Sequence, residues 1–421
     1  MRLECVALAT GMKCLPRNKL EQVKGNVLHD SHAEVLAIRA FNRFLVDECH
    51  DLARGVLGEC SAWVRWRRDQ EHTSRDRSAE KPELQDIRLV RAKQTGEIQG
   101  AMGADSSDQP FCLRDGVGIY MFCSEAPCGD ASMELTMADQ EDATPWTSRS
   151  LASEQVAEDM QGRGHFDRLG VVRRKPSRPD APPTWSKSCS DKLALKQCTS
   201  LLSSLTSRLV SPGNVYLSSL VLPEHQYVSA ACERAFGSTG RMKSLVGKQW
   251  EGDFAYRPFI VQTTSAGASD FEFSKRVVAR KAVELVDRNG TKADELAPVA
   301  SNLSSIYTAR KQEKLINGIL EGRKFPDPKG ASSVSRREMW KALASLAQYT
   351  EMPSLDFLVS PESKTYGDIK KLAKEQSSIA QVKADVVEVA LRGWRRNDGD
   401  DDWSLSKSDE EEIVRAGNVL T

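Results

Sequence analysis

His32 and Glu34 are the first residues of the chain whose types and spacing could carry out chemistry, in the segment Asp30-Ser31-His32-Ala33-Glu34. An imidazole can hold Zn²⁺ while a nearby carboxylate moves protons between water and a leaving nitrogen, as in the first half of a zinc-deaminase site. Ser31 and Glu34 also have the spacing of a capping box, in which Glu34 would only close the first turn of a helix. The cysteines further along the chain decide between these interpretations.

Cys128 is a candidate second ligand, because Pro127-Cys128 follows an apolar strand at 118–123 and precedes a short helix at 131–135. The helix dipole favours a thiolate at a helix N-terminus. Catalytic zinc takes three protein ligands and keeps one position open. The Cys-x-x-Cys pair of cytidine deaminases is excluded here, since Ala131 stands three residues after Cys128.

Cys189 is the best candidate for a third ligand, because it too stands just before a helix, in Ser188-Cys189-Ser190-Asp191-Lys192. Cys123 lies at the end of a strand and Cys198 on the apolar face of a helix. Both are better interpreted as small buried hydrophobic residues. The sequence therefore indicates a mixed His/Cys/Cys site.

These motifs, in this order, resemble the adenosine-to-inosine deaminase (editase) domain that eukaryotic RNA-editing and tRNA-specific adenosine deaminases share. The resemblance covers nearly the whole chain and extends to the runs 10–14, 170–178 and 196–200. A non-catalytic RNA-binding or structural-zinc relative is one alternative, against which Glu34 argues because a structural site needs no proton carrier. A cytidine deaminase is another, disfavoured by Ala131 and by the chain length.

The resemblance implies a role for each residue of the site. His32, Cys128 and Cys189 would hold Zn²⁺, and Glu34 would carry protons during hydrolysis of adenosine to inosine. Lys175 and Asp30 match the lysine and aspartate that link the family's site to deeper polar groups. An ordinary exposed lysine in a basic loop is the alternative for Lys175.

The resemblance also implies a buried inositol hexakisphosphate. Six phosphates in a protein interior need many cationic donors. The positions that match or lie next to the family pattern are Arg39, Lys192, Lys196, Ser200, Tyr366, Lys370, Lys383 and Trp394. Unconnected surface lysines are the alternative at the C-terminal end.

The substrate implied by the resemblance is tRNA, most specifically the adenosine 3′ of the anticodon (position 37) of alanine tRNA. The deaminase motifs begin close to Met1, which leaves no room for a preceding double-stranded-RNA-binding domain. Other structured RNA remains the alternative, and no membrane or DNA partner is expected. Four basic residues are candidates for phosphate contacts, with ordinary solvated charges as the alternative: Lys13, Arg173, Arg174 and Arg178.

Composition agrees with a folded intracellular protein. The 421 residues are 40% hydrophobic, and Lys+Arg and Asp+Glu both number 59, so the formal charge is zero. No apolar signal segment or long apolar run appears, which favours the cytoplasm or nucleus and reduced thiols.

The expected fold class is α/β: a cytidine-deaminase-like three-layer α-β-α core enlarged into an editase domain, with the family's N-terminal helix and strand missing. A single domain over 1–421 is expected, with a charged insertion at 65–110 and a solvated acidic tail at 398–421. Strands are expected at 3–10, 118–123 and 215–222. Helices are expected from His32 to about Asp47, from Lys187 onward, and in the basic region 364–394.

Overall fold

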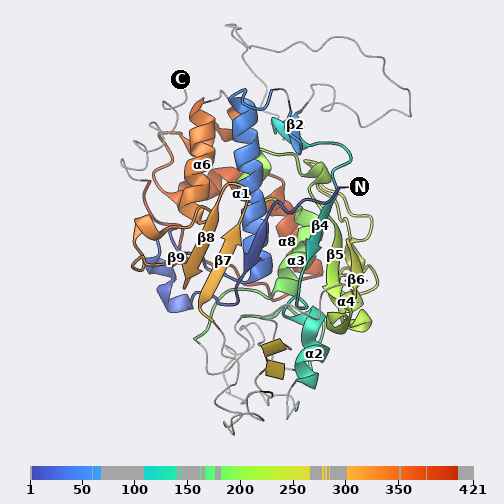
Figure 1. Cartoon of the computed structure of the whole chain (residues 1–421). Coiled ribbons are helices and arrows are strands. Elements are labelled where there is room, and N and C mark those ends of the chain that lie inside the picture. Colours follow the sequence, from blue (N-terminus) through green and yellow to red (C-terminus); the bar gives the residue numbers. More distant parts are fainter. Residues whose placement is uncertain are drawn as a thin grey trace, which may run out of the picture.

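The computed structural model describes residues 2–58, 60–67, 109–139, 166–175, 182–265, 301–349, 352–375 and 377–405, together with residues 144, 162, 277–278, 280–281 and 284. Helices and strands are mixed along the chain and in space (Figure 1). The α/β class expected from the sequence is confirmed. In the described residues the strands form three separate sheets.

A parallel sheet of β4 (Ile119–Phe122), β5 (Leu217–Pro223) and β6 (Ile260–Thr264) carries one side of the site. The chain leaves the carboxyl end of β4 and runs directly into Pro127-Cys128. The expectation of a buried strand at 118–123 is wrong for two residues, since Tyr120 is 45% and Phe122 48% exposed. The apolar composition there did not show which face of the strand would be covered.

An antiparallel sheet lies in front of α1 (Ala33–Ala53) in Figure 1. Its strand order is β1 (Leu8–Thr10), β7 (Leu303–Tyr307), β8 (Gln312–Ile316) and β9 (Ile319–Leu320). β1 is shorter than the expected strand at 3–10 and stands at the edge, paired with β7 alone among the described strands.

The third sheet is a pair, β2 (Val64–Trp66) and β3 (Phe111–Leu113). Residues 65–67 therefore belong to ordered structure, which corrects the start of the insertion expected at 65–110. Arg65 and Arg67, which begin the expected charged insertion, are also largely shielded from solvent: their side chains are 17% and 7% exposed and pair with Asp115 and Asp253. Residues 68–108 lie outside the described part of the chain.

Seven α-helices are described besides short 3-10 turns. After α1 they are α2 (Met133–Ala138), α3 (Cys189–Thr199), α4 (Ser229–Phe236), α6 (Arg336–Tyr349), α7 (Tyr366–Glu375) and α8 (Ile379–Val389). The 3-10 turns are η1 (Arg17–Gln22), η3 (Asp130–Ser132), η5 (Thr206–Arg208), η6 (Pro212–Asn214), η7 (Glu224–Gln226), η8 (Lys243–Leu245), η10 (Pro328–Gly330) and η11 (Pro353–Leu358).

The main hydrophobic core joins α1, α3, β5 and the C-terminal helices. Leu45, Leu193, Leu220 and Val386 are completely buried within it. Burial of large apolar side chains contributes about 1.5–3 kcal/mol each, so this core holds the N-termini of α1 and α3 in fixed positions. Within the described residues, no helix combines the length and apolar character needed to cross a membrane.

The expectation of a solvated acidic tail is wrong for Asp400, which is 3% exposed. Its carboxylate accepts from the backbone N–H of Gly25 at 2.7 Å and contacts His29 at 2.7 Å. Arg336 lies 3.4 Å away. The segment thus anchors the C-terminal region to the first residues of the fold, and residues 406–421 lie outside the described chain.

Candidate zinc and active site

The N-terminus of α1 places His32 at the site. His32 is the N-cap residue, and the carbonyl of Gly11 accepts from the backbone N–H of Ala33 at 3.1 Å. Gly11 has a φ of 150°, and a Cβ there would lie 2.1 Å from the carbonyl oxygen of Ser31. Glycine is therefore required for the 10–14 run to pass so close to the start of α1.

Two loops bring Cys128 and Cys189 together. A Cβ on Gly129, whose φ is 104°, would lie 2.2 Å from Oγ of Ser188, so glycine permits this approach. The backbone N–H of Ser190 donates to the carbonyl of Cys128 at 3.0 Å, and its hydroxyl donates to the carbonyl of Pro127 at 3.0 Å. The second ligand loop is thereby bonded to the start of α3.

The N-terminus of α3 is stabilised by an N-cap hydrogen bond and by an ion pair. Oγ of Ser188 accepts from the backbone N–H of Asp191 at 3.1 Å. The fully buried carboxylate of Asp191 accepts from the guanidinium of Arg241 at 2.6 Å and from the backbone N–H of Arg173 at 2.8 Å. An N-cap of this kind contributes about 1 kcal/mol to helix stability, and the ion pair fixes the helix N-terminus next to the site.

The three candidate ligands converge: the donor atoms of His32, Cys128 and Cys189 all lie within 4.8 Å of one another. Nδ1 of His32 is 3.8 Å from Sγ of Cys128. The hydrogen bond from Cys189 holds the pKa of Cys128 well below its usual range despite burial, and the charges of Lys175 and His32 add to this effect. An imidazole with thiolate ligands at this spacing fits Zn²⁺.

Lys175 and Asp30 form a buried ion pair behind the ligands. Nζ of Lys175 lies 3.0 Å from the carboxylate of Asp30 and 2.9 Å from Sγ of Cys189. Although burial opposes it, the charges of Lys175 and Lys192 hold the pKa of Asp30 well below its usual range. Lys175 is 3% exposed, so its interpretation as an ordinary exposed lysine is wrong.

Glu34 lies in the first turn of α1, half-buried, two residues after His32. Its charge is among those that raise the pKa of the Cys189 thiol, after burial and the neighbouring Cys128. The capping-box interpretation is wrong: the N-cap is His32 rather than Ser31, and it makes no side-chain cap hydrogen bond. Glu34 therefore lies close enough for its charge to act on Cys189, and it has no capping role.

Two residues at the site were missed by sequence reasoning. Cys14 groups with Asp30 and His32, with potential ligand atoms within 4.8 Å of one another. Ser186 donates its hydroxyl to Asp30 and accepts from Lys192 at 2.9 Å. Cys14 could have been suspected from the run 10–14, whereas the spacing of Ser186 carries no signal.

Several of the residues expected to bind inositol phosphate form an interior basic cluster. Burial, and then the charge of Lys383, lowers the pKa of Lys196 to about 7. Burial, and then the charges of Lys370 and Arg396, lowers the pKa of Lys383 to about 8. The ammonium groups of Lys196 and Lys383 donate to the neutral oxygens of Leu202, at 2.6 Å, and Ser204, at 3.0 Å.

Other members of the expected set lie around this cluster. Burial and the charge of Arg336 lower the pKa of Arg39 to about 10, and Arg39 donates to the carbonyl of Val334 at 2.8 Å. Lys370 pairs with Asp401, while the ring of Trp394 lies 4.9 Å from Nζ of Lys187. Tyr366 and Ser200 are buried. This excess of confined positive charge suits a polyanion.

The four predicted RNA contacts have different outcomes. Lys13 is exposed and Arg174 is half-buried, so both stay candidates. Arg173 is wrong as a phosphate contact, because it is 1% exposed and its guanidinium donates to the carbonyl of Gly162 at 2.9 Å. The sequence pattern of consecutive basic residues did not reveal that this one turns inward. Arg178 lies outside the described residues.

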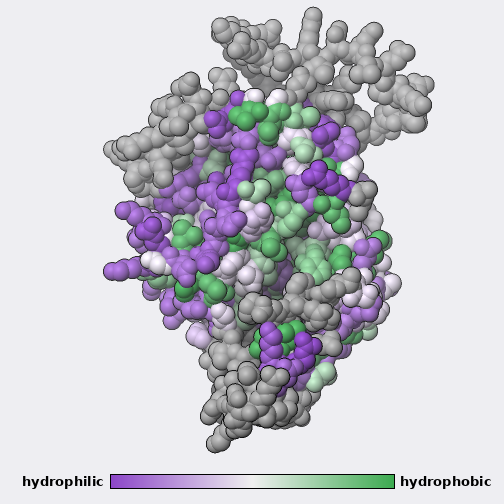
Figure 2. Space-filling view, in the orientation of Figure 1, coloured by the Kyte–Doolittle hydropathy of each residue, from purple (hydrophilic) through white to green (hydrophobic). Residues whose placement is uncertain are grey.

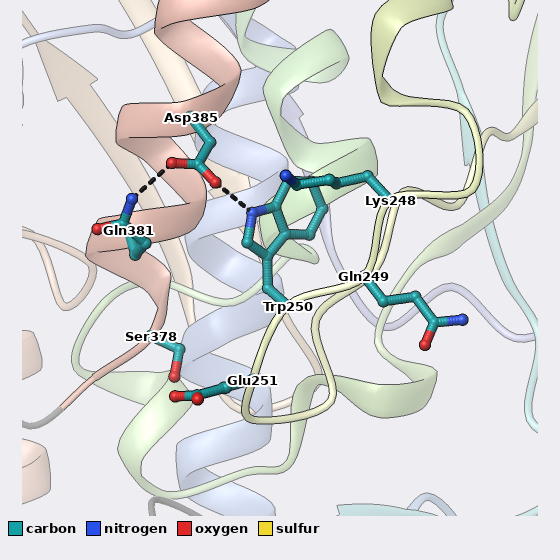
Figure 3. A pocket seen from close by; sticks show the side chains of 7 residues that line it. All are labelled: Lys248, Gln249, Trp250, Glu251, Ser378, Gln381 and Asp385. Atoms are coloured by element: carbon teal, nitrogen blue, oxygen red, sulfur yellow. Dashed lines mark hydrogen bonds between the residues drawn. The ribbon is translucent and has the colours of Figure 1, made fainter.

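A depression of about 440 Å³ lies apart from these residues, between the 248–251 loop and α8 (Figure 3). Trp250 donates its indole N–H to Asp385 at 2.8 Å, and Gln381 donates to the same carboxylate at 2.5 Å. None of the predicted site residues lines it. Its polar groups already serve to join the loop to the helix.

Comparison with known families decides the class of the site. The profile of the adenosine-deaminase (editase) domain matches residues 7–67 and 84–398. The chain belongs to this family. The editase domain thus includes His32, Glu34, Cys128 and Cys189, and its matched range begins again only at residue 84, beyond β2.

Named relatives of this editase domain are found in several eukaryotes. A Schizosaccharomyces pombe protein named tRNA-specific adenosine deaminase 1 is 33% identical over 402 residues, which cover 94% of this chain and 84% of that protein. Its Saccharomyces cerevisiae namesake is 29% identical over 53% of this chain and 46% of that protein. The Drosophila melanogaster double-stranded RNA-specific editase Adar is 24% identical over 54% of this chain and 29% of that protein.

Proposed function

We propose that this chain is a zinc-dependent deaminase that converts adenosine to inosine in tRNA. The observation that carries the proposal is the convergence of one imidazole and two thiols in an editase domain, with the charge of Glu34 acting on one of the thiols. A structural zinc site would need the ligands but no acidic residue in the first turn of the same helix. Glu34 therefore distinguishes a catalytic site from a structural one.

The roles of the residues follow from their positions. Zn²⁺ held by His32, Cys128 and Cys189 would supply a nucleophilic water at neutral pH. Glu34 takes a proton from the attacking water and delivers it to N1 of adenine; it then takes the proton of the new hydroxyl group on C6 and delivers it to the amino group, which leaves as ammonia. The ammonium group of Lys175, bonded to Asp30, holds Sγ of Cys189 in place.

Adenosine 37 of alanine tRNA, next to the anticodon, is the proposed target. The Schizosaccharomyces pombe relative named as tRNA-specific is 33% identical along 94% of this chain, whereas the double-stranded RNA editase is 24% identical along 54%. An anticodon loop already presents unpaired bases, so the cost of bringing one base to the zinc site is small. Recognition can then depend on loop shape and phosphate contacts.

Inosine formation in alanine tRNA transcripts tests this function. We expect one anticodon-loop adenosine to be converted by zinc-loaded protein. Glu34→Gln should lose about 10²–10⁴-fold in rate, the usual contribution of a general acid–base residue, while it retains one zinc per chain. A wild-type protein with full zinc that forms no inosine in any tRNA would contradict the proposal. Conversion only in duplex RNA would favour an editase of the double-stranded type.

We also propose that the interior basic cluster holds inositol hexakisphosphate. The charge of Lys383 acts unfavourably on Lys196, and both ammonium groups donate to neutral oxygens among the described residues. Bound phosphates would neutralise this positive charge. Burial of like charges without anions is unfavourable. The group would act as a structural core and would take no part in the proton transfers.

Mass spectrometry of acid-denatured protein tests the cofactor. We expect about one inositol hexakisphosphate per chain in protein purified from a eukaryotic host, and a much lower yield for the double variant Lys196→Gln/Lys383→Gln. Lys371→Gln/Lys374→Gln, which changes two exposed lysines of α7, is the matched control. A yield far below one per chain in wild-type protein would refute the assignment.

A further inference from the structure

Two segments that extend from the site carry a local excess of positive charge. Residues 13–24 and 321–330 together hold seven basic and three acidic residues, in a chain whose total charge is zero. We call six exposed cations of these segments, all of their basic residues except Lys13, the η1 surface: Arg17, Lys19, Lys24, Arg323, Lys324 and Lys329. Figure 2 shows hydrophilic residues over β8 and β9, the strands that lead into the second segment.

The two segments are held against each other by a small apolar cluster. Leu20, Val23 and Ile319 are buried in it, and the rings of Trp185 and Phe325 pack at its margin. Nζ of Lys19 lies 5.4 Å from the ring of Phe325, which joins the two segments directly. Cations supported in this way lose little conformational freedom when they bind a ligand.

Arg17 connects this surface with the zinc site. Its guanidinium lies 4.2 Å over the ring of Trp185, and its backbone N–H donates to the carbonyl of Pro183 at 2.9 Å. Trp185 immediately precedes Ser186, which bonds Asp30. A depression of about 400 Å³ lies beside Arg17. The basic surface thus begins one residue away from the polar network of the site.

The charges of this surface are not neutralised within the described part of the chain. None of its six cations makes an ion pair with another described residue. By contrast, Arg310 on the neighbouring β7–β8 turn pairs with Asp51. Of the three acidic side chains, Asp327 accepts a turn hydrogen bond from the backbone N–H of Lys329 at 2.9 Å.

We propose that the η1 surface binds the sugar-phosphate backbone of a substrate RNA stem that continues from the nucleotides at the zinc site. This inference rests on the proposed RNA deaminase function and adds where the RNA lies. The regular phosphate spacing of a stem suits cations held at fixed positions. These contacts carry no base specificity, so they strengthen binding without selecting the adenosine.

The salt dependence of RNA binding tests the surface. The variant Lys19→Gln/Arg323→Gln/Lys324→Gln/Lys329→Gln removes four of its charges. Each lost phosphate contact lowers the slope of log Kd against log[KCl] by about 0.7–0.9. Fluorescence anisotropy with a labelled tRNA transcript should therefore show a slope smaller by about 3 and an affinity at 50 mM KCl at least ~30-fold weaker.

The matched control is Lys243→Gln/Lys248→Gln/Lys371→Gln/Lys374→Gln, which removes the same charge from exposed positions elsewhere. The single-turnover rate at saturating enzyme should stay within about twofold in both variants, because neither touches the site. An unchanged slope in the η1 variant, or an equal loss in the control, overturns the proposal. Wild-type protein that binds tRNA but forms no inosine would instead count against the proposed function alone.

Discussion

Replacing Lys175 by Met should weaken zinc binding as well as the fold. Nζ of Lys175 is the group that touches both the carboxylate of Asp30 and the sulfur of Cys189. Methionine keeps much of the side-chain volume but donates no hydrogen bond. The variant therefore leaves the thiolate of a candidate zinc ligand without its positive neighbour, and leaves Asp30 with Lys192 as its remaining ammonium partner.

The size of the effect follows from the distances. Two unit charges 3.0 Å apart interact by about 5.5 kcal/mol at an effective dielectric constant of 20, before the cost of desolvation. Removing one partner of a buried pair typically costs 3–5 kcal/mol. Because Lys192 still neutralises Asp30, we expect a loss near the lower end, about 3 kcal/mol. Loss of a group that orients a metal ligand lowers metal affinity about 10–100-fold.

Zinc affinity and stability can be measured separately. Competition with a chromogenic chelator gives the zinc dissociation constant, and urea unfolding in excess EDTA gives the stability of the metal-free protein. Lys192→Met is the matched control, because Lys192 pairs with the same carboxylate of Asp30 but donates to the hydroxyl of Ser186 where Lys175 donates to a cysteine. Its side chain is 23% exposed, so its ion pair is partly screened and its stability loss should be smaller.

The expected pattern is a large change in zinc affinity for Lys175→Met and little change for Lys192→Met. Two results would refute the reasoning. A zinc dissociation constant within about twofold of wild type in Lys175→Met would show that the 2.9 Å contact with Cys189 does not support the ligand. Equal losses of zinc affinity in both variants would show that an ion pair of Asp30 with either lysine, and not the contact of Lys175 with Cys189, supports the zinc ligands.

Three further outcomes are expected. The pKa values of Lys196 and Lys383 lie near 7 and 8, so between these values and the usual 10.5 the unfolded chain binds more protons than the folded one, and stability rises with pH. The thermal unfolding temperature of protein free of inositol phosphate should therefore increase from pH 7 to 9. This increase should be smaller in Lys196→Met/Lys383→Met. Gly129→Ala should lose bound zinc in metal analysis, because its Cβ would meet Ser188 at 2.2 Å, whereas Gly58→Ala, with open space around it, should retain it. Arg173→Gln should lower the unfolding temperature, because its buried donors lose their carbonyl partners, while RNA affinity measured by anisotropy on the folded fraction stays unchanged.

The candidate ligand set could be proposed from the sequence because its signals are local. His32 stands beside Glu34, and Cys128 and Cys189 each stand next to the start of a helix, where a thiolate is favoured. The structure brings these three residues within 4.8 Å, as the prediction required. The helix beginning near His32 was also predictable from apolar spacing, although α1 continues six residues beyond Asp47 to Ala53.

Burial of charged residues could not be predicted, because it depends on contacts between distant segments. Arg173 belongs to a run of basic residues typical of an exposed loop, but its guanidinium is buried and donates to the carbonyl of Gly162. Asp400 belongs to an acidic run but accepts a hydrogen bond from the backbone N–H of Gly25, 375 positions away in the sequence. Tyr120 shows the converse, an apolar strand residue that remains 45% exposed. Local composition shows neither the distant partners of Arg173 and Asp400 nor the exposure of Tyr120.

Asp30 shows how these distant contacts can connect the two proposed cofactors. Its carboxylate binds Lys175, which reaches the sulfur of Cys189, and also Lys192, a member of the set expected to bind inositol phosphate. One buried carboxylate cannot fully neutralise two ammonium groups, so the pair retains net positive charge. A polyanion beside Lys192 would balance that charge and leave more of the carboxylate's attraction for Lys175. Occupancy of the interior basic cluster would thereby strengthen the support of a zinc ligand, without any contact between the two cofactors.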